Sequence, residues 1–175
     1  MDAFTQAVTS WHDFYIMTGT AAASLLGLLF VGLSLNLEII SRQENIRLSG
    51  LATQTFGNFV YVIFLSITML IPDQNSLGVG IPLLIMGFYG TLANGRALFR
   101  AVRKPNPAWG PGYVFWRFVG PVLASLGLLV VSFYAFQSNA GALYGLIAVI
   151  IILLLVATRN SWDLLVQARV QAQSK

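Results

Sequence analysis

The sequence contains no cysteine and few charged residues, and each shortage excludes classes of protein. Without cysteine the chain cannot form disulfides, a thiolate nucleophile, a cysteine-ligated zinc site or an iron–sulfur cluster. Charged residues make up 9% of the 175 residues, whereas an ordinary soluble domain has about 25%. With 57% hydrophobic residues and a mean hydropathy of +0.75, the chain has too little polar surface to cover a soluble body. The composition therefore indicates a protein whose surface faces lipid.

Arrangements of residues that carry catalysis or bind cofactors are also missing from the sequence. The single histidine, His12, neighbours Asp13 but has no candidate nucleophile or second metal ligand nearby. The six acidic residues are spread along the chain and do not supply convergent metal ligands. No phosphate-binding or dinucleotide-binding motif is present. The sequence predicts a protein that is not an enzyme and has no cofactor or metal.

Five hydrophobic runs predict membrane-spanning helices. They cover residues 15–36, 51–71, 78–99, 114–136 and 141–158. Each run is close to the roughly 20 residues that a helix needs to cross a hydrocarbon core. The short turns PDQNS and QSNAG predict two antiparallel hairpins, one from the second and third helices and one from the fourth and fifth. We expect an all-α integral membrane protein with five transmembrane helices in a single domain, residues 1–175.

Apolar stripes at helical spacing lie before the first run and after the fifth. The first stripe is Phe4, Val8, Trp11 and Tyr15, and the second is Trp162, Leu165, Val166, Arg169 and Val170. Such stripes predict short helices along the membrane interface at both ends of the chain, the second as a continuation of the fifth helix.

All ten lysine and arginine residues lie on one side of this map. They follow the first and fifth runs or flank the connection between the third and fourth. The N-terminal segment and the other two connections carry no lysine or arginine. The positive-inside rule makes the basic side cytoplasmic, with the N-terminus outside and the C-terminus inside. A nucleic-acid partner is not expected, because the basic residues are scattered along membrane edges and form no continuous patch.

Small residues in the first and third spans predict close helix packing. They are Gly19, Ala23 and Gly27 in the first span, and Gly87, Gly90 and Gly95 in the third. Small side chains let two helix backbones approach closely, which stabilises helix pairs in lipid. The first span is therefore the best candidate for the tightest helix–helix contact, either inside one chain or between copies.

Strongly polar side chains gather toward the basic ends of the spans. They are Asn36, Glu38, Gln54, Asn58, Asn94, Arg96 and Arg117. Amides and charges in lipid are costly unless paired, so these groups should point inward and meet one another. We expect Asn58 to bond Asn94. We also expect an ion pair between Glu38 and either Arg96 or Arg117.

This polar cluster has two interpretations. The first is interhelical packing alone, in which the polar groups determine the geometry of the bundle. The second is a polar vestibule open to the cytoplasm, either as the inner mouth of a pore or as a pocket for an anionic lipid headgroup.

Residues 11–38, WHDFYIMTGTAAASLLGLLFVGLSLNLE, resemble the opening of uncharacterised small multi-span membrane proteins of bacteria. The resemblance covers an aromatic and acidic lead into a helix rich in small residues. It implies a multi-pass protein of the bacterial inner membrane, and it carries no activity, cofactor or site.

Three functions of different classes follow from these observations. The first is a homo-oligomeric pore or channel-like protein, based on the small face of the first span and the polar vestibule. The second is an accessory or scaffold subunit of a larger membrane complex, because the chain has no chemistry of its own. An enzyme that acts on lipid is disfavoured, because the sequence offers no acid–base or metal set. The expected partners are anionic lipid headgroups on the cytoplasmic side, further copies of the chain, or another membrane protein.

Overall fold

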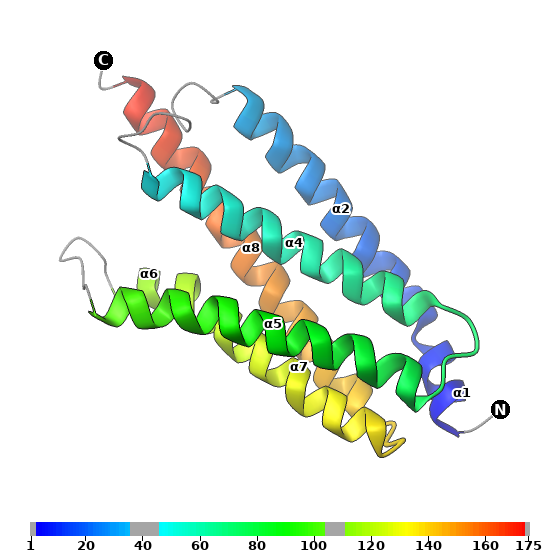
Figure 1. Cartoon of the computed structure of the whole chain (residues 1–175). Coiled ribbons are helices and arrows are strands. Elements are labelled where there is room, and N and C mark those ends of the chain that lie inside the picture. Colours follow the sequence, from blue (N-terminus) through cyan, green and yellow to red (C-terminus); the bar gives the residue numbers. More distant parts are fainter. Residues whose placement is uncertain (1–2, 36–45, 104–110, 174–175) are drawn as a thin grey trace.

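The computed structural model describes residues 3–35, 46–103 and 111–173, and these residues form helices and turns without a strand (Figure 1). The helices are α1 (Ala3–Ser10), α2 (His12–Leu35), α4 (Ile46–Leu70), α5 (Ser76–Arg103), α6 (Pro111–Val114), the π-helical turn η2 (Phe115–Val119), α7 (Gly120–Phe136) and α8 (Ala142–Gln173). Five stretches are long and apolar enough to cross a membrane: His12–Leu35, Leu48–Leu70, Ser76–Arg103, Gly112–Phe136 and Ala142–Gln167. The chain is thus an all-helical protein with five candidate spans, which fits a multi-pass membrane protein.

Local hydrogen bonds explain where the two short turns end. The Asn75 side chain accepts a hydrogen bond from the backbone N–H of Gly78 (2.8 Å), which caps the start of α5. Asn139 accepts one from the backbone N–H of Gly141 (2.8 Å) just before α8. Asp73 and Ser138 adopt positive φ angles of 54° and 55°, the conformation that reverses the chain at these points.

The two ends of the bundle differ in charge. One end holds the start of α4, the end of α5, α6, η2 and the later part of α8, and we call it the basic end (Figure 1). The arginines on these elements are Arg47, Arg96, Arg100, Arg103, Arg117, Arg159 and Arg169. The opposite end holds α1 and both short turns, with Asp13 and Asp73.

Helix α1 packs against the other helices at the end of the bundle opposite the basic end. Phe4 and Val8 are buried, as is Tyr15 at the start of α2. The Thr5 hydroxyl donates to the backbone carbonyl of Gln74 in the α4–α5 turn (3.1 Å). The first apolar stripe therefore faces the bundle, because Phe4, Val8 and Tyr15 belong to its buried core and Trp11 packs against that core. At the other end of the chain, α8 continues unbroken to Gln173, as the second stripe predicts.

The consecutive helices α4 and α5 diverge from each other. They lie close at their connecting turn and spread apart toward the basic end (Figure 1). Helix α4 packs mainly on α2 and α8, whereas α5 packs mainly on α7. The predicted hairpin of the second and third spans is thus joined at the turn but open along its length, with α7 and α8 behind the opening.

The closest packing in the bundle lies between α5 and α7. A Cβ atom at Gly87 would lie 3.0 Å from the backbone nitrogen of Leu129, and one at Gly80 would lie 2.6 Å from the Phe136 ring. The Ser132 hydroxyl donates to the carbonyl of Gly80 across the same contact (2.8 Å). Glycine is required here because any side chain would push the two backbones apart.

The small residues of α2 pack less closely than those of α5. A Cβ at Gly19 would lie 2.9 Å from the Cβ of Ser66 in α4, so this glycine is in close contact. Ala23 is exposed, and a Cβ at Gly27 would meet nothing within 4 Å. Gly95 in α5 also faces open space. Within the chain the tightest contact is therefore in the third span and not in the first, since α2 turns most of its small face outward.

Candidate functional site

The opening between α4 and α5 contains a cavity with two adjoining parts. The part nearer the basic end has a volume of about 630 Å³ and includes Arg100 and Arg117, and we call it the vestibule. The deeper part has a volume of about 250 Å³, and we call it the inner chamber. The two parts share Thr53, Gln54, Ala93 and Asn94 in their walls.

The lining residues follow helical spacing on each element. Helix α4 contributes Gly50, Thr53, Gln54, Gly57, Asn58 and Tyr61; α5 contributes Tyr89, Gly90, Ala93, Asn94, Ala97, Arg100 and Ala101. η2, α7 and α8 contribute Arg117, Phe118, Pro121, Ser125, Leu128 and Leu153. Half of the lining residues on α4 and four of the seven on α5 are glycine, alanine or threonine, so the faces across the opening leave space between them.

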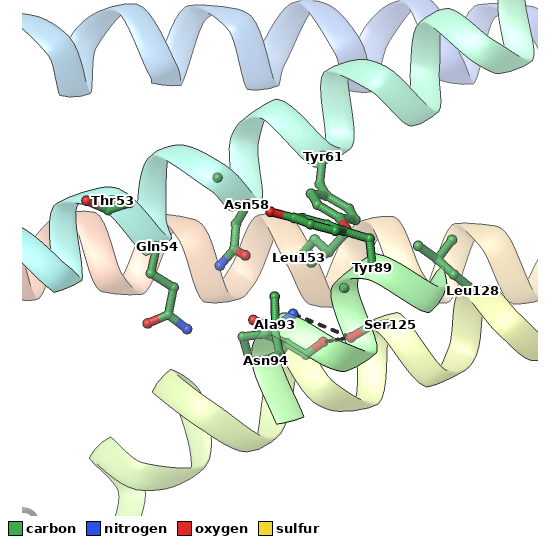
Figure 2. A pocket seen from close by; sticks show the side chains of 13 residues that line it. Thr53, Gln54, Asn58, Tyr61, Tyr89, Ala93, Asn94, Ser125, Leu128 and Leu153 are labelled. Carbon is green, nitrogen blue, oxygen red and sulfur yellow. Dashed lines mark hydrogen bonds between the residues drawn. The ribbon is translucent and has the colours of Figure 1, made fainter. Parts of the chain in front are cut away.

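Asn58 points from α4 into the inner chamber (Figure 2). Its side chain is 6% exposed, and its Nδ2 has no hydrogen-bond partner among the described residues. The expected bond with Asn94 does not form, because Asn94 Nδ2 instead points to the Ser125 hydroxyl at 3.5 Å (Figure 2). A buried donor without a partner costs about 1–3 kcal/mol, so the inner chamber holds a donor ready for an acceptor.

Gln54 has a structural partner that follows from a proline. Pro121 has no N–H, so it cannot donate the usual helical hydrogen bond to the carbonyl of Arg117, four residues earlier. The side-chain amide of Gln54 donates to that carbonyl instead. The π-helical turn η2 lies at the same point, immediately before Gly120 and Pro121. Such turns are frequent at functional sites.

Arg117 brings a positive charge into the wall of the vestibule. Its side chain is 9% exposed. Its guanidinium carbon lies 5.6 Å from the ring centroid of Tyr113 and 5.5 Å from that of Phe118. It also faces Gly50 of α4, where a Cβ would lie 3.5 Å from a guanidinium nitrogen. Contact with aromatic faces favours a buried guanidinium.

Of the predicted cluster, Gln54, Asn58, Asn94 and Arg117 line the cavity. Arg96 is exposed and lies outside the lining, because it is on another face of α5. Asn36 and Glu38 lie outside the described residues, and so does either ion pair expected for Glu38.

Arg100 is a lining residue that does not belong to the predicted cluster. It lines the vestibule, and its Nε donates to the carbonyl of Arg96 (3.2 Å). The signal was present in the sequence. Gly90, Asn94, Ala97 and Arg100 follow one another at three- or four-residue steps, which places them on one helix face.

The cavity is open along its side. Thr53, Tyr89 and Ala93 line it and are also exposed, and all three belong to the diverging helices α4 and α5. In a membrane this side would face lipid chains, so a molecule could have a polar part inside the cavity and an apolar part in the bilayer.

The lining offers hydrogen-bonding groups and positive charge. Its polar groups are amides, hydroxyls and two arginines, and the described lining includes no carboxylate or histidine. In the described part of the chain, no three His, Cys, Asp or Glu side chains come together as metal ligands. Guanidinium groups suit anions and amides suit carbonyl or hydroxyl groups.

Comparison of the chain with protein-family models, with curated proteins and with solved structures found no match.

Proposed function

We propose that the chain is a non-enzymatic integral membrane protein that binds the anionic headgroup of a lipid in its vestibule, on the cytoplasmic side. The observation that carries this proposal is the buried Arg117 in the wall of a cavity that also opens sideways between α4 and α5. The arginines Arg100 and Arg117 attract an anion, and the side opening leaves a path for acyl chains. Basic pockets between transmembrane helices are known binding sites for anionic headgroups.

The depth of the cavity favours ligand binding over a pore through one chain. From Gly50 to Tyr61 the lining extends over twelve residues of α4, about 16 Å, which is half of a hydrocarbon core of roughly 30 Å. The buried side chains of Leu128 and Leu153 line the deep part. A polar cavity that reaches mid-membrane from one side suits a lipid whose headgroup stays near that surface.

A homo-oligomeric pore is a second candidate, and the exposed small face of α2 favours it. Ala23 is exposed and Gly27 faces open space, so this face is available to another copy of the chain or to a partner subunit. The mass of the detergent-solubilised protein by light scattering tests this candidate. If the wild type is an oligomer built on this face, Gly27→Leu should reduce its mass to that of a monomer. A wild type that is already a monomer, or an oligomer whose mass Gly27→Leu does not change, argues against this candidate.

The headgroup proposal is tested by native mass spectrometry of the full chain in nanodiscs that contain zwitterionic and anionic lipids in equal amounts. The wild type should retain the anionic lipid preferentially. Arg100→Gln should weaken this preference about fivefold, since one basic residue near the surface contributes about 1 kcal/mol. Arg96→Gln is the matched control, because Arg96 is on the same helix but outside the lining.

Two outcomes would contradict the proposal. Equal retention of both lipids by the wild type would show that the vestibule does not select an anion. Displacement of the bound lipid by millimolar inorganic phosphate would instead identify a small soluble anion as the ligand.

A further inference from the structure

The inner chamber lies deeper than the arginines, and its binding chemistry differs from that of the vestibule. Neither Arg100 nor Arg117 lines it, and its walls combine the amides of Asn58 and Asn94 with hydroxyl groups and aliphatic side chains. One neutral donor does not compensate the cost of removing a full negative charge from water, and no arginine lines this part of the cavity, so the chamber suits a neutral oxygen acceptor. The group that enters the chamber should therefore be an uncharged acceptor.

The neighbouring amides each donate a hydrogen bond within the protein, whereas Asn58 does not, so Asn58 is the best-placed donor for a ligand. Gln54 donates to the carbonyl of Arg117, and Asn94 points to Ser125. Asn58 Nδ2 has no hydrogen-bond partner in the described part of the chain, although only 6% of the residue is exposed. Figure 2 shows its amide directed into the space between α4 and α5.

The chamber has room for a ligand group because Gly57 and Gly90 form part of its wall. A Cβ at Gly57 would meet nothing within 4 Å, so the space in front of this glycine is unfilled by protein. Small residues that leave space beside a buried donor make a pocket, whereas small residues in the α5–α7 contact close the gap between helices.

The spacing between Asn58 and the basic vestibule limits the ligand. Arg117 faces Gly50, which is two helical turns from Asn58, or about 12 Å along α4. Hydrogen bonds of about 3 Å at the two ends leave roughly 6 Å of this distance for the ligand itself. The ligand must therefore carry an anionic group and a neutral acceptor that are separated by a short linker, with its apolar part leaving through the side opening.

We infer that the inner chamber binds an acyl ester carbonyl of the same anionic lipid, with Asn58 Nδ2 as the hydrogen-bond donor. This inference rests on the proposed function, because the headgroup in the vestibule brings the ester to the chamber. A glycerophospholipid has the required order of groups: phosphate, a short glycerol linker, ester carbonyls and then acyl chains.

The test compares a diacyl phosphatidylglycerol with its dialkyl ether analogue, which lacks the carbonyls, in nanodiscs of phosphatidylcholine. The wild type should bind the diester about fivefold more tightly than the diether, the effect of one hydrogen bond. Asn58→Leu should bind both lipids equally and still prefer them to phosphatidylcholine. Gly57→Leu should also lose the preference for the ester, because its side chain fills the chamber. Gly95→Leu, at another glycine that faces open space, should keep it.

The outcomes separate the two proposals. If the wild type prefers both anionic lipids to phosphatidylcholine but binds ester and ether equally, the inner chamber does not bind the carbonyl and the headgroup proposal stands. The same conclusion follows if both chamber variants keep the ester preference. If the wild type shows no preference for anionic lipid, both proposals fail.

Discussion

Asn58→Leu should stabilise the protein in the absence of its ligand, although most substitutions of buried residues destabilise. The wild-type side chain holds a donor with no hydrogen-bond partner in the described part of the chain, at 6% exposure. Leucine has the same branched shape and number of side-chain heavy atoms as asparagine but no polar atom, and the adjoining 250 Å³ chamber has room for its larger volume. The substitution therefore removes the cost of the buried donor without leaving a new cavity.

The magnitude follows from the cost of the donor. A buried donor without a partner costs about 1–3 kcal/mol. Water that enters the 250 Å³ chamber recovers part of this cost, so we expect a gain near the lower limit, about 1 kcal/mol. For a chain of this size such a gain raises the melting temperature by about 2–4 °C.

Thermal unfolding of the full chain in a zwitterionic detergent, followed by circular dichroism, measures this shift. Gln54→Leu is the matched control, because it is one turn away on α4 but its amide donates to the carbonyl of Arg117. It should lower the melting temperature, since it leaves that carbonyl without its donor. A decrease of similar size in Asn58→Leu would refute the reasoning, because it would show that Asn58 is hydrogen-bonded in the ligand-free bundle.

Three further predictions test the packing, the proline and the orientation. Gly87→Leu should destabilise by about 1–3 kcal/mol in the same assay, because its Cβ would meet the α7 backbone at 3.0 Å, and unchanged stability would argue against the α5–α7 contact. Pro121→Ala supplies the missing N–H for Arg117, so Gln54→Leu should cost much less in this background, and additive effects in the double-mutant cycle would contradict the role of Gln54. A C-terminal fluorescent protein should be active and a C-terminal alkaline phosphatase inactive, as the positive-inside rule predicts; the reverse pattern would overturn the proposed orientation.

The five spans could be predicted because their signal is local. A helix in lipid must satisfy its own backbone hydrogen bonds, so the length of each apolar run is enough to identify it. The polar groups Gln54, Asn58, Asn94 and Arg117 could be assigned to one region for a similar reason, since charges and amides in lipid avoid the hydrocarbon. Their partners could not be assigned, because these depend on the rotation and separation of the helices.

Arg96 and Arg100 show how much depends on the phase of a helix. Both arginines are near the end of α5, and depth alone favours Arg96 because it is closer to the apolar run. A helix rotates by about 100° per residue, so Arg96 points about 160° away from Asn94, whereas Arg100 lies only about 60° from the lining residue Ala97 and reaches the edge of the same face. Extending the three- and four-residue steps from Gly90 would have selected Arg100.

The glycines show a second limit of sequence-based prediction, which knowledge of the helix face does not remove. Gly87 and Gly57 are both glycines in apolar helices, yet one touches a neighbouring backbone and the other faces empty space. Small side chains permit close approach but do not cause it, and the packing of α4 on α8 and of α5 on α7 decides which faces meet. Because α4 and α5 are held by different partners, the small faces between them stay apart and leave a cavity. A stripe of small residues in a membrane helix therefore predicts either a tight contact or a pocket, and a polar donor on the same face, as with Gly57 and Asn58, favours the pocket.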